Sequence, residues 1–393
     1  FWKAAEYCSG DKARFALVST NSISQGQSIS YFWKPLLAGG LRIDFAVKSF
    51  KWRNLASENA TVTVVVIGCS CNSDGACCIY DGETRLLASR ISPYLVTGDN
   101  VFVDRESKPI SALPQMTKGN YYGLSEGLLL DGRERQELLD SGLPSRFIKV
   151  FKGGAEIVKG LQRWCLWFPD AKLPVTAASN QIVAKRVAQV KKSRLSSPDA
   201  SAVGMAERPH QFREMNACTR ASIAIPNVSS ESRPYLPVTL EDSEVVFPNT
   251  AFALYDAELF CLAIAASKLH LIWAITVCGK LETRIRYSNT LGWNTFPVPL
   301  LTEQNKIDLT RCAEDILLAR EAHFPATIAD LYDPENMPDN LRRAHERNDE
   351  VLERIYIGRR FKNDTERLEK LFELYTKMTA EAASKPVTKK RGT

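Results

Sequence analysis

The first 70 residues alternate three β-rich runs with one helix-like stretch, and this order constrains the fold more than any other feature of the chain. The runs are residues 14–20 (RFALVST), 41–48 (LRIDFAVK) and 60–68 (ATVTVVVIG). The helix-like stretch, residues 28–38, ends before Gly39-Gly40, and Pro35 within it predicts a kink or an early stop. The nearly continuous β-branched residues of the third run are typical of a strand covered on both faces, so the pattern predicts an α/β sheet.

These elements correspond to the last part of such a sheet without its first part. We therefore expect the chain to begin within an enzyme, with the catalytic groups upstream and the substrate-recognising half in the residues present. An exposed edge at the first strand would favour aggregation unless another strand covers it, which also favours a larger parent sheet.

The rest of the sequence predicts an α+β region followed by an all-α region. After a loop-rich junction over residues 70–96, short apolar runs punctuated by Gly and Pro predict a mixed domain. One long helix is expected from Asp256 to Gly279, and it should be buried rather than membrane-spanning because Lys268 and His270 interrupt its apolar run. The expected divisions are 1–96, the end of a catalytic domain; 97–300, the mixed domain; 301–384, a helical bundle; and 385–393, a basic disordered tail.

Three charge-rich segments, residues 303–322, 339–357 and 364–383, predict the helices of the bundle, because apolar residues recur on one face of each. Asn363, followed three residues later by Glu366, resembles a capping box at the start of the third helix.

Composition permits a globular protein of two or three domains, since 45% of the 393 residues are hydrophobic and 24% are charged. The formal net charge of +6 is modest. Positive charge is concentrated from Arg146 to Arg194, where eleven Lys or Arg residues stand against the two acids Glu156 and Asp170. This segment indicates a polyanionic partner.

Ten cysteines without an N-terminal signal sequence predict free thiols in a reducing, cytoplasmic location. A cluster of four could coordinate zinc, but its C-x-C-x5-C-C spacing matches no usual zinc knuckle, so we expect no metal site. The cluster consists of Cys69, Cys71, Cys77 and Cys78.

Residues 280–288 (KLETRIRYS) are a candidate for reading DNA bases. If they form a strand, its period of two places Glu282, Arg284 and Arg286 on one face. Arginine can donate two hydrogen bonds to guanine, and glutamate can accept one from cytosine. An exposed strand whose Glu and Arg side chains pair with one another explains the same spacing equally well.

The basic segment supplies candidate contacts to the DNA backbone, since positive charge gives affinity that does not depend on sequence. We expect Arg146, Lys152, Lys185 and Arg186 to act there as a group. The aromatics of this segment, including Trp164 and Phe168, are explained by a core strand without any ligand.

Phe50 and Trp52 alternate just after the second predicted strand, where an aromatic ring could stack on a base extruded from the duplex. A core or rim position is the commoner role for such residues. No nucleophile, acid–base centre or Gly-rich phosphate loop is recognisable elsewhere.

Several strings, in order, resemble a known family. Residues 18–28 (VSTNSISQGQS), 45–57 (FAVKSFKWRNLAS) and 62–68 (VTVVVIG) are similar to the part of a class I S-adenosyl-L-methionine-dependent DNA adenine-N6 methyltransferase that follows its Asn-Pro-Pro-aromatic motif. Later strings resemble the target-recognition domain and C-terminal helices of the single-chain, Mme-type (Type IIL) restriction-modification enzymes; they are KGLQRWCLW (159–167), IPNVSSESRPYLP (225–237), SKLHLIWAITVCGKLETRIRYSNTLGWNTFPVP (267–299) and IADLYDPENMP (328–338).

The resemblance implies a DNA-binding part that selects the sequence and a catalytic domain that methylates N6 of an extruded adenine. It implies a Rossmann-like methyltransferase sheet, double-stranded DNA as partner and S-adenosyl-L-methionine as cofactor of the full-length parent. In relatives the base-determining positions match Glu282, Arg284 and Arg286, which favours base recognition for these three. Phe50 or Trp52 would face the extruded base.

The sequence departs from the family pattern in lacking the Asn-Pro-Pro-aromatic motif and the acidic-x-x-x-Gly-x-Gly cofactor loop. We therefore expect no catalytic residue and no cofactor binding in this chain alone, and we expect an upstream methyltransferase half, in the same parent chain or in a separate subunit, as a partner. The alternative is a non-catalytic specificity or scaffold subunit that docks on a separate methyltransferase chain.

Overall fold

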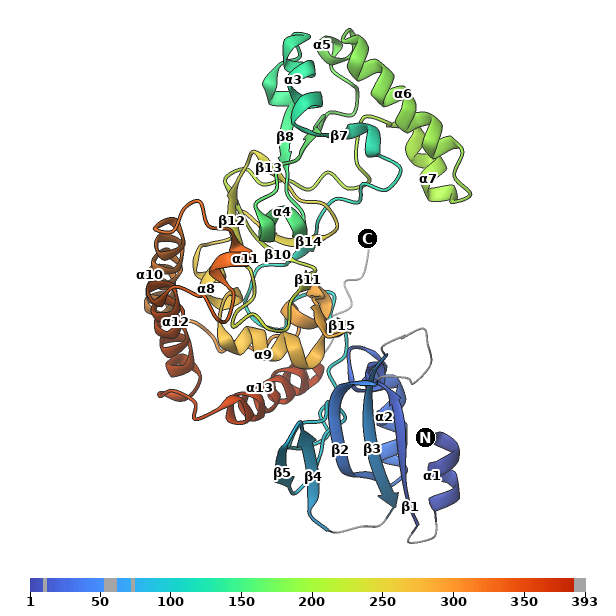
Figure 1. Cartoon of the computed structure of the whole chain (residues 1–393), viewed down its shortest axis with the longest axis vertical. Coiled ribbons are helices and arrows are strands. Elements are labelled where there is room, and N and C mark those ends of the chain that lie inside the picture. Colours follow the sequence, from blue (N-terminus) through green and yellow to red (C-terminus); the bar gives the residue numbers. More distant parts are fainter. Residues whose placement is uncertain (10–12, 53–61, 72–74, 385–393) are drawn as a thin grey trace, which may run out of the picture.

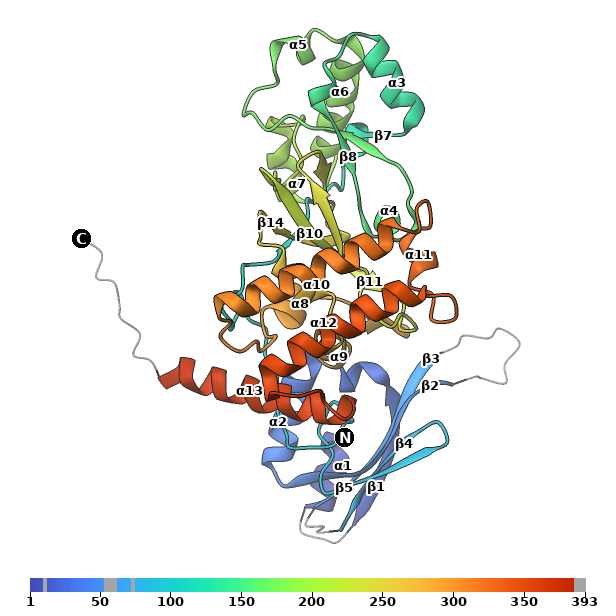
Figure 2. The ribbon, with the colours of Figure 1, turned by 90° about the vertical axis from the view of Figure 1, so that its left-hand side faces the viewer.

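The computed structural model describes residues 1–9, 13–52, 62–71 and 75–384. The molecule is elongated (Figure 1), with a sheet built from the first 88 residues at one end and a small lobe carrying helices α5 to α7 at the other. Helices α10, α12 and α13 lie along the middle (Figure 2). The predicted tail, residues 385–393, falls outside the described residues.

The N-terminal sheet has the strand order β1-β3-β2-β4-β5. Strand β3 pairs antiparallel with both β1 and β2, whereas β2 and β4 pair in parallel. Its first elements are α1 (Trp2–Cys8), β1 (Arg14–Thr20), the 3-10 turn η1 (Asn21–Ser24), α2 (Ser28–Ala38), β2 (Leu41–Trp52) and β3 (Val62–Cys71). The three predicted strands are thus present, and the expectation of an early stop at Pro35 is wrong because α2 continues to Ala38.

The loop-rich junction predicted for residues 70–96 is partly wrong. Strands β4 (Cys77–Asp81) and β5 (Thr84–Ala88) form a hairpin there. Gly82 lies in the turn between them with φ +58°, a backbone conformation that glycine adopts without strain. All ten cysteines are buried free thiols, and no group of three or more His, Cys, Asp or Glu side chains among the described residues is placed to hold a metal.

Three small sheets make up the middle of the chain, with the orders β12-β10-β14-β6, β11-β16-β15 and β13-β8-β9-β7. Their strands are β6 (Thr117–Lys118), β7 (Leu129–Leu130), β8 (Ile148–Phe151), β9 (Trp164–Leu166), β10 (Ala221–Pro226), β11 (Val228–Ser229), β12 (Thr239–Asp242), β13 (Val245–Val246), β14 (Ala251–Tyr255), β15 (Gly279–Leu281) and β16 (Arg284–Arg286). The short helices among them are α3 (Gly132–Asp140), α4 (Gly154–Lys159), α5 (Val175–Ala178), α6 (Gln181–Leu195) and α7 (Ala200–Gly204).

The single helix predicted from Asp256 to Gly279 is two helices, α8 (Phe260–Ala265) and α9 (Lys268–Val277). The break occurs because the Ser267 side chain accepts a hydrogen bond from the His270 amide and starts α9 afresh. Asp256 does not cap a helix; its carboxylate accepts hydrogen bonds from other backbone amides. Both helices are almost entirely buried, as predicted.

The predicted C-terminal helices are present as α10 (Glu303–Glu321), α12 (Asp339–Ile357) and α13 (Asp364–Ser384), with the short α11 (Ile328–Leu331) between the first two. Asn363 accepts a hydrogen bond from the Glu366 amide, which confirms the predicted cap. None of the helices in the described ranges combines the length and apolar character that crossing a bilayer requires.

Buried polar contacts attach these helices to the middle of the chain. Asp349 of α12 accepts hydrogen bonds from the Tyr235 hydroxyl at 2.8 Å and from the Lys268 amide at 2.7 Å. Burial raises the pKa of Asp349 to about 7. Helix α13 packs Phe372 against both Trp273 and Tyr94, so it ties α9 to the segment that leaves the N-terminal sheet.

Candidate nucleic-acid interface

The candidate base-reading segment is a tight hairpin rather than one strand. Strands β15 and β16 pair antiparallel, with Leu281 opposite Arg284, and Glu282 lies in the turn with φ +61°. The prediction that Glu282 shares a strand face with the two arginines is therefore wrong, because a residue in the turn leaves the period-two pattern. Arg284 and Arg286 do share a face of β16 and are exposed, while Ile285 between them is buried.

Glu282 and Arg284 form an ion pair at 3.1 Å, so the paired arrangement considered from the sequence is present. Their side chains are 74% and 45% exposed, respectively. Water screens such a pair and it contributes little stability, so both groups can exchange it for other partners at low cost.

The hairpin rests on the segment that follows β1. The Lys280 amide donates to the Gln25 side-chain oxygen at 3.0 Å, and the Asn21 side chain donates to the Glu282 carbonyl at 3.5 Å. Gly26, with φ +57°, brings its backbone beside Gly279, where an added Cβ would lie 3.5 Å from the Gly279 nitrogen. The contact joins segments more than 250 residues apart, and it was not predicted from the sequence.

Phe50 and Trp52 lie at the end of β2 and are 36% and 49% exposed. Their ring centroids are 6.3 Å apart, and Val64 and Val62 face them across the ladder on β3. The structure therefore brings the two rings together on an accessible rim and does not bury them in a core.

Much of the basic segment is committed to contacts within the protein. Five of its eleven cations are held by carboxylates or backbone carbonyls: Lys149 by Glu244, Lys152 by Glu241, Arg163 by Glu156, Arg186 by Glu134, and Arg194 by the carbonyls of Met205, Arg208 and Gln211. Arg194 is only 2% exposed, and burial lowers its pKa to about 10. The charge count in the sequence thus overstates the positive surface.

The four predicted backbone contacts fall into two pairs. Lys152 pairs with Glu241 at 2.8 Å, and Arg186 donates to the Gly127 and Leu129 carbonyls. Arg146 and Lys185 are exposed, and neither forms an ion pair among the residues that the structure describes. Only the second pair is free to meet a ligand as the structure stands.

A hollow beside α6 contains Lys185 and Arg186 but is acidic. Its lining also includes a third cation, Arg163, which pairs with Glu156, and four carboxylates. We call it the acidic hollow: Glu126, Asp131, Glu134 and Glu137 together with Arg163, Lys185 and Arg186. These carboxylates oppose the approach of a phosphate backbone at this place.

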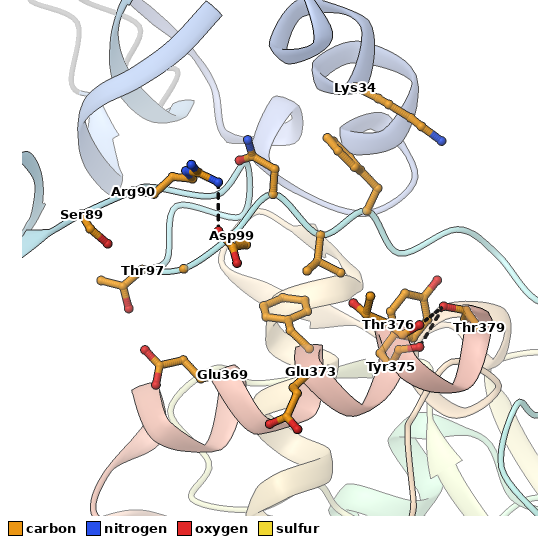
Figure 3. A pocket seen from close by; sticks show the side chains of 15 residues that line it. Lys34, Ser89, Arg90, Thr97, Asp99, Glu369, Glu373, Tyr375, Thr376 and Thr379 are labelled. Carbon is orange, nitrogen blue, oxygen red and sulfur yellow. Dashed lines mark hydrogen bonds and ion pairs between the residues drawn. The ribbon is translucent and has the colours of Figure 1, made fainter. Parts of the chain in front are cut away.

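A second hollow, of about 860 Å³, lies between α13 and residues 89–102 (Figure 3). Arg90 within it already pairs with Asp99 at 2.9 Å, and Glu369 and Glu373 of α13 also line it. Its mixed charge does not fit a polyanion.

Comparison with protein families defines the class: the chain matches models of a target recognition domain and of a DNA-methyltransferase domain. Models described as the MmeI target recognition domain, the MmeI DNA-methyltransferase domain and the MmeI C-terminal domain match residues 97–300, 1–81 and 301–383, respectively. The first match covers more than half of the chain. The chain therefore belongs to the MmeI family.

Two relatives illustrate the similarity. DNA methyltransferase A of Bacillus subtilis (strain 168) is 38% identical over 382 residues, which are 96% of this chain and 43% of that protein. A solved structure of the Type IIL restriction-modification enzyme MmeI in complex with DNA matches with a TM-score of 0.88 and 33% identity, over 96% of this chain and 51% of that one. The chain spans about half the length of the relatives it matches.

Proposed function

We propose that this chain selects the DNA sequence for a site-specific adenine-N6 methyltransferase of a restriction-modification system. The observation that carries the proposal is the hairpin β15–β16, which lies within the matched target recognition region and presents two exposed arginines next to a glutamate. The solved relative is a complex with DNA, which supports duplex DNA as the ligand.

Base reading would use the hairpin's three polar side chains. Arg284 and Arg286 each donate two hydrogen bonds to O6 and N7 of a guanine in the major groove, and Glu282 accepts from N4 of a cytosine. Binding would exchange the exposed Glu282–Arg284 pair for these bonds. Arg146 would contact the DNA backbone, and Lys185 would add only a weak contact because carboxylates of the acidic hollow surround it. Lys152 and Arg186 would act chiefly by supporting the protein around them.

Phe50 and Trp52 would stack on the base that leaves the duplex, because their accessible rings lie at the end of β2. The hairpin contacts the segment after β1 through Gln25 and Asn21. This contact would couple the position of the recognised bases to that of the extruded one.

Methyl transfer would need groups that the 393 residues do not contain, since no Asn-Pro-Pro-aromatic segment and no acidic-x-x-x-Gly-x-Gly loop occurs in them. The described sheet holds one parallel pair, β2 and β4, whereas a cofactor crevice of this class forms beyond the carboxyl ends of neighbouring parallel strands. The residues present thus do not fit S-adenosyl-L-methionine. We propose the division 1–96, 97–300 and 301–384 for the end of the catalytic domain, the target recognition domain and the helical region.

The methyltransferase half that supplies the missing groups would add to the free edge of β1. Among the residues whose structure is described, this strand pairs only with β3, and it exposes Val18 and Leu17. A further strand would satisfy its unpaired backbone groups. The same edge would serve a half within one parent chain or a separate subunit.

Selection of bound duplexes from a random library by the 393-residue chain tests the proposal. A recurring sequence that changes when Arg284→Ala is used supports base recognition by the hairpin. Binding without any sequence preference, or no binding at low salt, would contradict it. Adding a separately produced methyltransferase half and measuring methyl transfer to the selected duplex tests the division of labour.

A further inference from the structure

A cleft of about 580 Å³ lies between the N-terminal sheet and the hairpin β15–β16, which we call the reading hairpin. It differs from the acidic hollow and from the hollow beside α13 in its charge. We call it the basic cleft: Gln25, Arg105, Lys118, Lys280 and Arg286 with the polar residues around them. No aspartate or glutamate lines it. Its cations come from segments far apart in the sequence, namely the loop after residue 97, β6, β15 and β16.

These cations are available to a ligand. Within the described residues, none of Arg105, Lys118, Lys280 and Arg286 belongs to an ion pair, in contrast to Lys152 and Arg186. The pKa of Lys280 is lowered mainly by burial and to a smaller extent by the nearby charge of Lys48. The carboxylates of Glu231 and Asp81 act in the opposite direction and raise it. A bound anion would relieve this crowding of positive charge.

Gln25 gives an independent indication of a ligand. It is 8% exposed and its side-chain oxygen accepts from the Lys280 amide, yet its Nε2 group has no hydrogen-bond partner. A buried amide donor left without a partner is costly, and such groups are usually satisfied when a ligand is bound. The lining also includes Gly26, Gln27 and Ser28 at the start of α2, where the dipole of an eleven-residue helix favours negative charge.

We propose that the basic cleft binds a phosphodiester of the DNA strand, at the joint between the sheet and the reading hairpin. The inference rests on the proposed function and adds a positioning site to it. Arg105 and Lys118 contact the phosphate oxygens, Gln25 Nε2 donates to one of them, and Arg286 lies at the rim where the groove edge begins. The cleft fixes the backbone between the bases that are read and the base that is extruded.

The first test compares charge-removing variants of the 393-residue chain on a short duplex of mixed sequence. Lys118→Ala and Arg105→Ala should each weaken binding about tenfold, as expected for one charge-assisted hydrogen bond, and lower the slope of log K against log salt by about 0.9. Lys377→Ala, an exposed position on α13 with the same change in net charge, serves as the control and should bind like the wild type. Equal behaviour of the cleft variants and this control would overturn the proposal.

The second test uses Gln25→Glu, which keeps the side-chain shape and the acceptor for Lys280 but places a carboxylate in the cleft. It should weaken binding more than Lys118→Ala does, while the thermal unfolding midpoint shows that the chain is folded. Unchanged affinity in the folded variant would contradict a phosphate at this position. If the variant does not fold, the outcome rests on Lys118→Ala and on the third test.

The third test locates the phosphate. Single phosphates of a duplex selected by the wild-type chain are replaced by uncharged methylphosphonates. The wild type should lose affinity at one or two positions, and Lys118→Ala should show no further loss there. Losses that simply add at every position would overturn the cleft assignment while leaving sequence recognition intact. Failure of the wild type to select any sequence would instead contradict the proposed function itself.

Discussion

The acidic hollow and the basic cleft contain cations in opposite settings. In the hollow, three cations share the lining with four carboxylates, and two of the three are held by carboxylates: Arg163 by Glu156 and Arg186 by Glu134. In the cleft, four cations meet without a lining carboxylate. The hollow belongs to the stretch richest in Lys and Arg, yet the cleft has the stronger positive character. Positive surface is therefore a property of how segments meet.

The physical reason is the origin of the neutralising groups. Lys149 of β8 and Lys152, which directly follows β8, are paired by Glu244 and Glu241, which lie about ninety residues further along the chain. A cation that folds next to a distant carboxylate gains stability and loses its attraction for a polyanion. The residues that line the cleft with its cations include no carboxylate.

The largest expected effect is a loss of stability when Arg186, which supports the fold around the acidic hollow, is replaced. Arg186→Ala leaves the Gly127 and Leu129 carbonyls and the Glu134 carboxylate without their donor, which should lower the free energy of unfolding by about 3 kcal/mol. Chemical denaturation measures this, with Lys185→Ala on the same helix as a near-neutral control. Weaker DNA binding with unchanged stability would show that Arg186 reaches DNA and would remove the contrast between the two sites.

The next effect concerns the hairpin. Arg284→Ala should relax the preference at one base pair by about 1 to 3 kcal/mol, because a bidentate contact to guanine is lost. Competition between duplexes that differ at single positions measures the change. Arg146→Ala is the control, since an exposed backbone contact should weaken all duplexes alike. An unchanged preference profile would argue against base reading by β16.

A smaller difference is expected between the duplex affinities of variants at Lys118 and Lys185. Lys118→Ala in the basic cleft should weaken binding about tenfold, whereas Lys185→Ala beside the acidic hollow should weaken it only about twofold, because nearby carboxylates already reduce the potential there. Titrations at several salt concentrations compare the two variants. Equal losses would mean that the lining carboxylates do not matter to DNA.

The smallest effect comes from removing an acid. Glu137→Gln in the acidic hollow should strengthen duplex binding slightly at low salt and have no effect at high salt, because screening suppresses interactions between exposed charges. Binding measured with Glu373→Gln on α13 provides the reference for the same change in net charge. Weaker binding by Glu137→Gln would show that the hollow contributes to recognition through its carboxylates.

The sequence predicted elements with strong local periodicity. The strand Arg14–Thr20 and the helices α10, α12 and α13 are present close to their expected bounds. The break between α8 and α9 was missed because a continuous apolar run hides a cap made by one serine. The hairpin was missed because Glu282, a residue other than glycine, adopts a positive φ that no periodicity reveals.

The candidate site was predictable only in its residue types. Arg284, Arg286, Phe50 and Trp52 are accessible, as their proposed roles require. The ion pairs that Lys152 and Arg186 form with glutamates depend on contacts between distant segments. The same is true of the cleft that brings Arg105 and Lys118 together. Contacts of this kind leave no local pattern in a single amino-acid sequence.

The bond from the Lys280 amide to Gln25, together with the close approach of Gly26 to Gly279, has a consequence for altering specificity. Residues at the tip of the hairpin can be substituted without disturbing this contact, whereas the base of the hairpin is held against the segment that follows β1. Lengthening β15 by one residue would change the position at which the hairpin meets a bound duplex. Under the proposed function, the distance from the recognised sequence to the methylated adenine would be set by this contact within the protein.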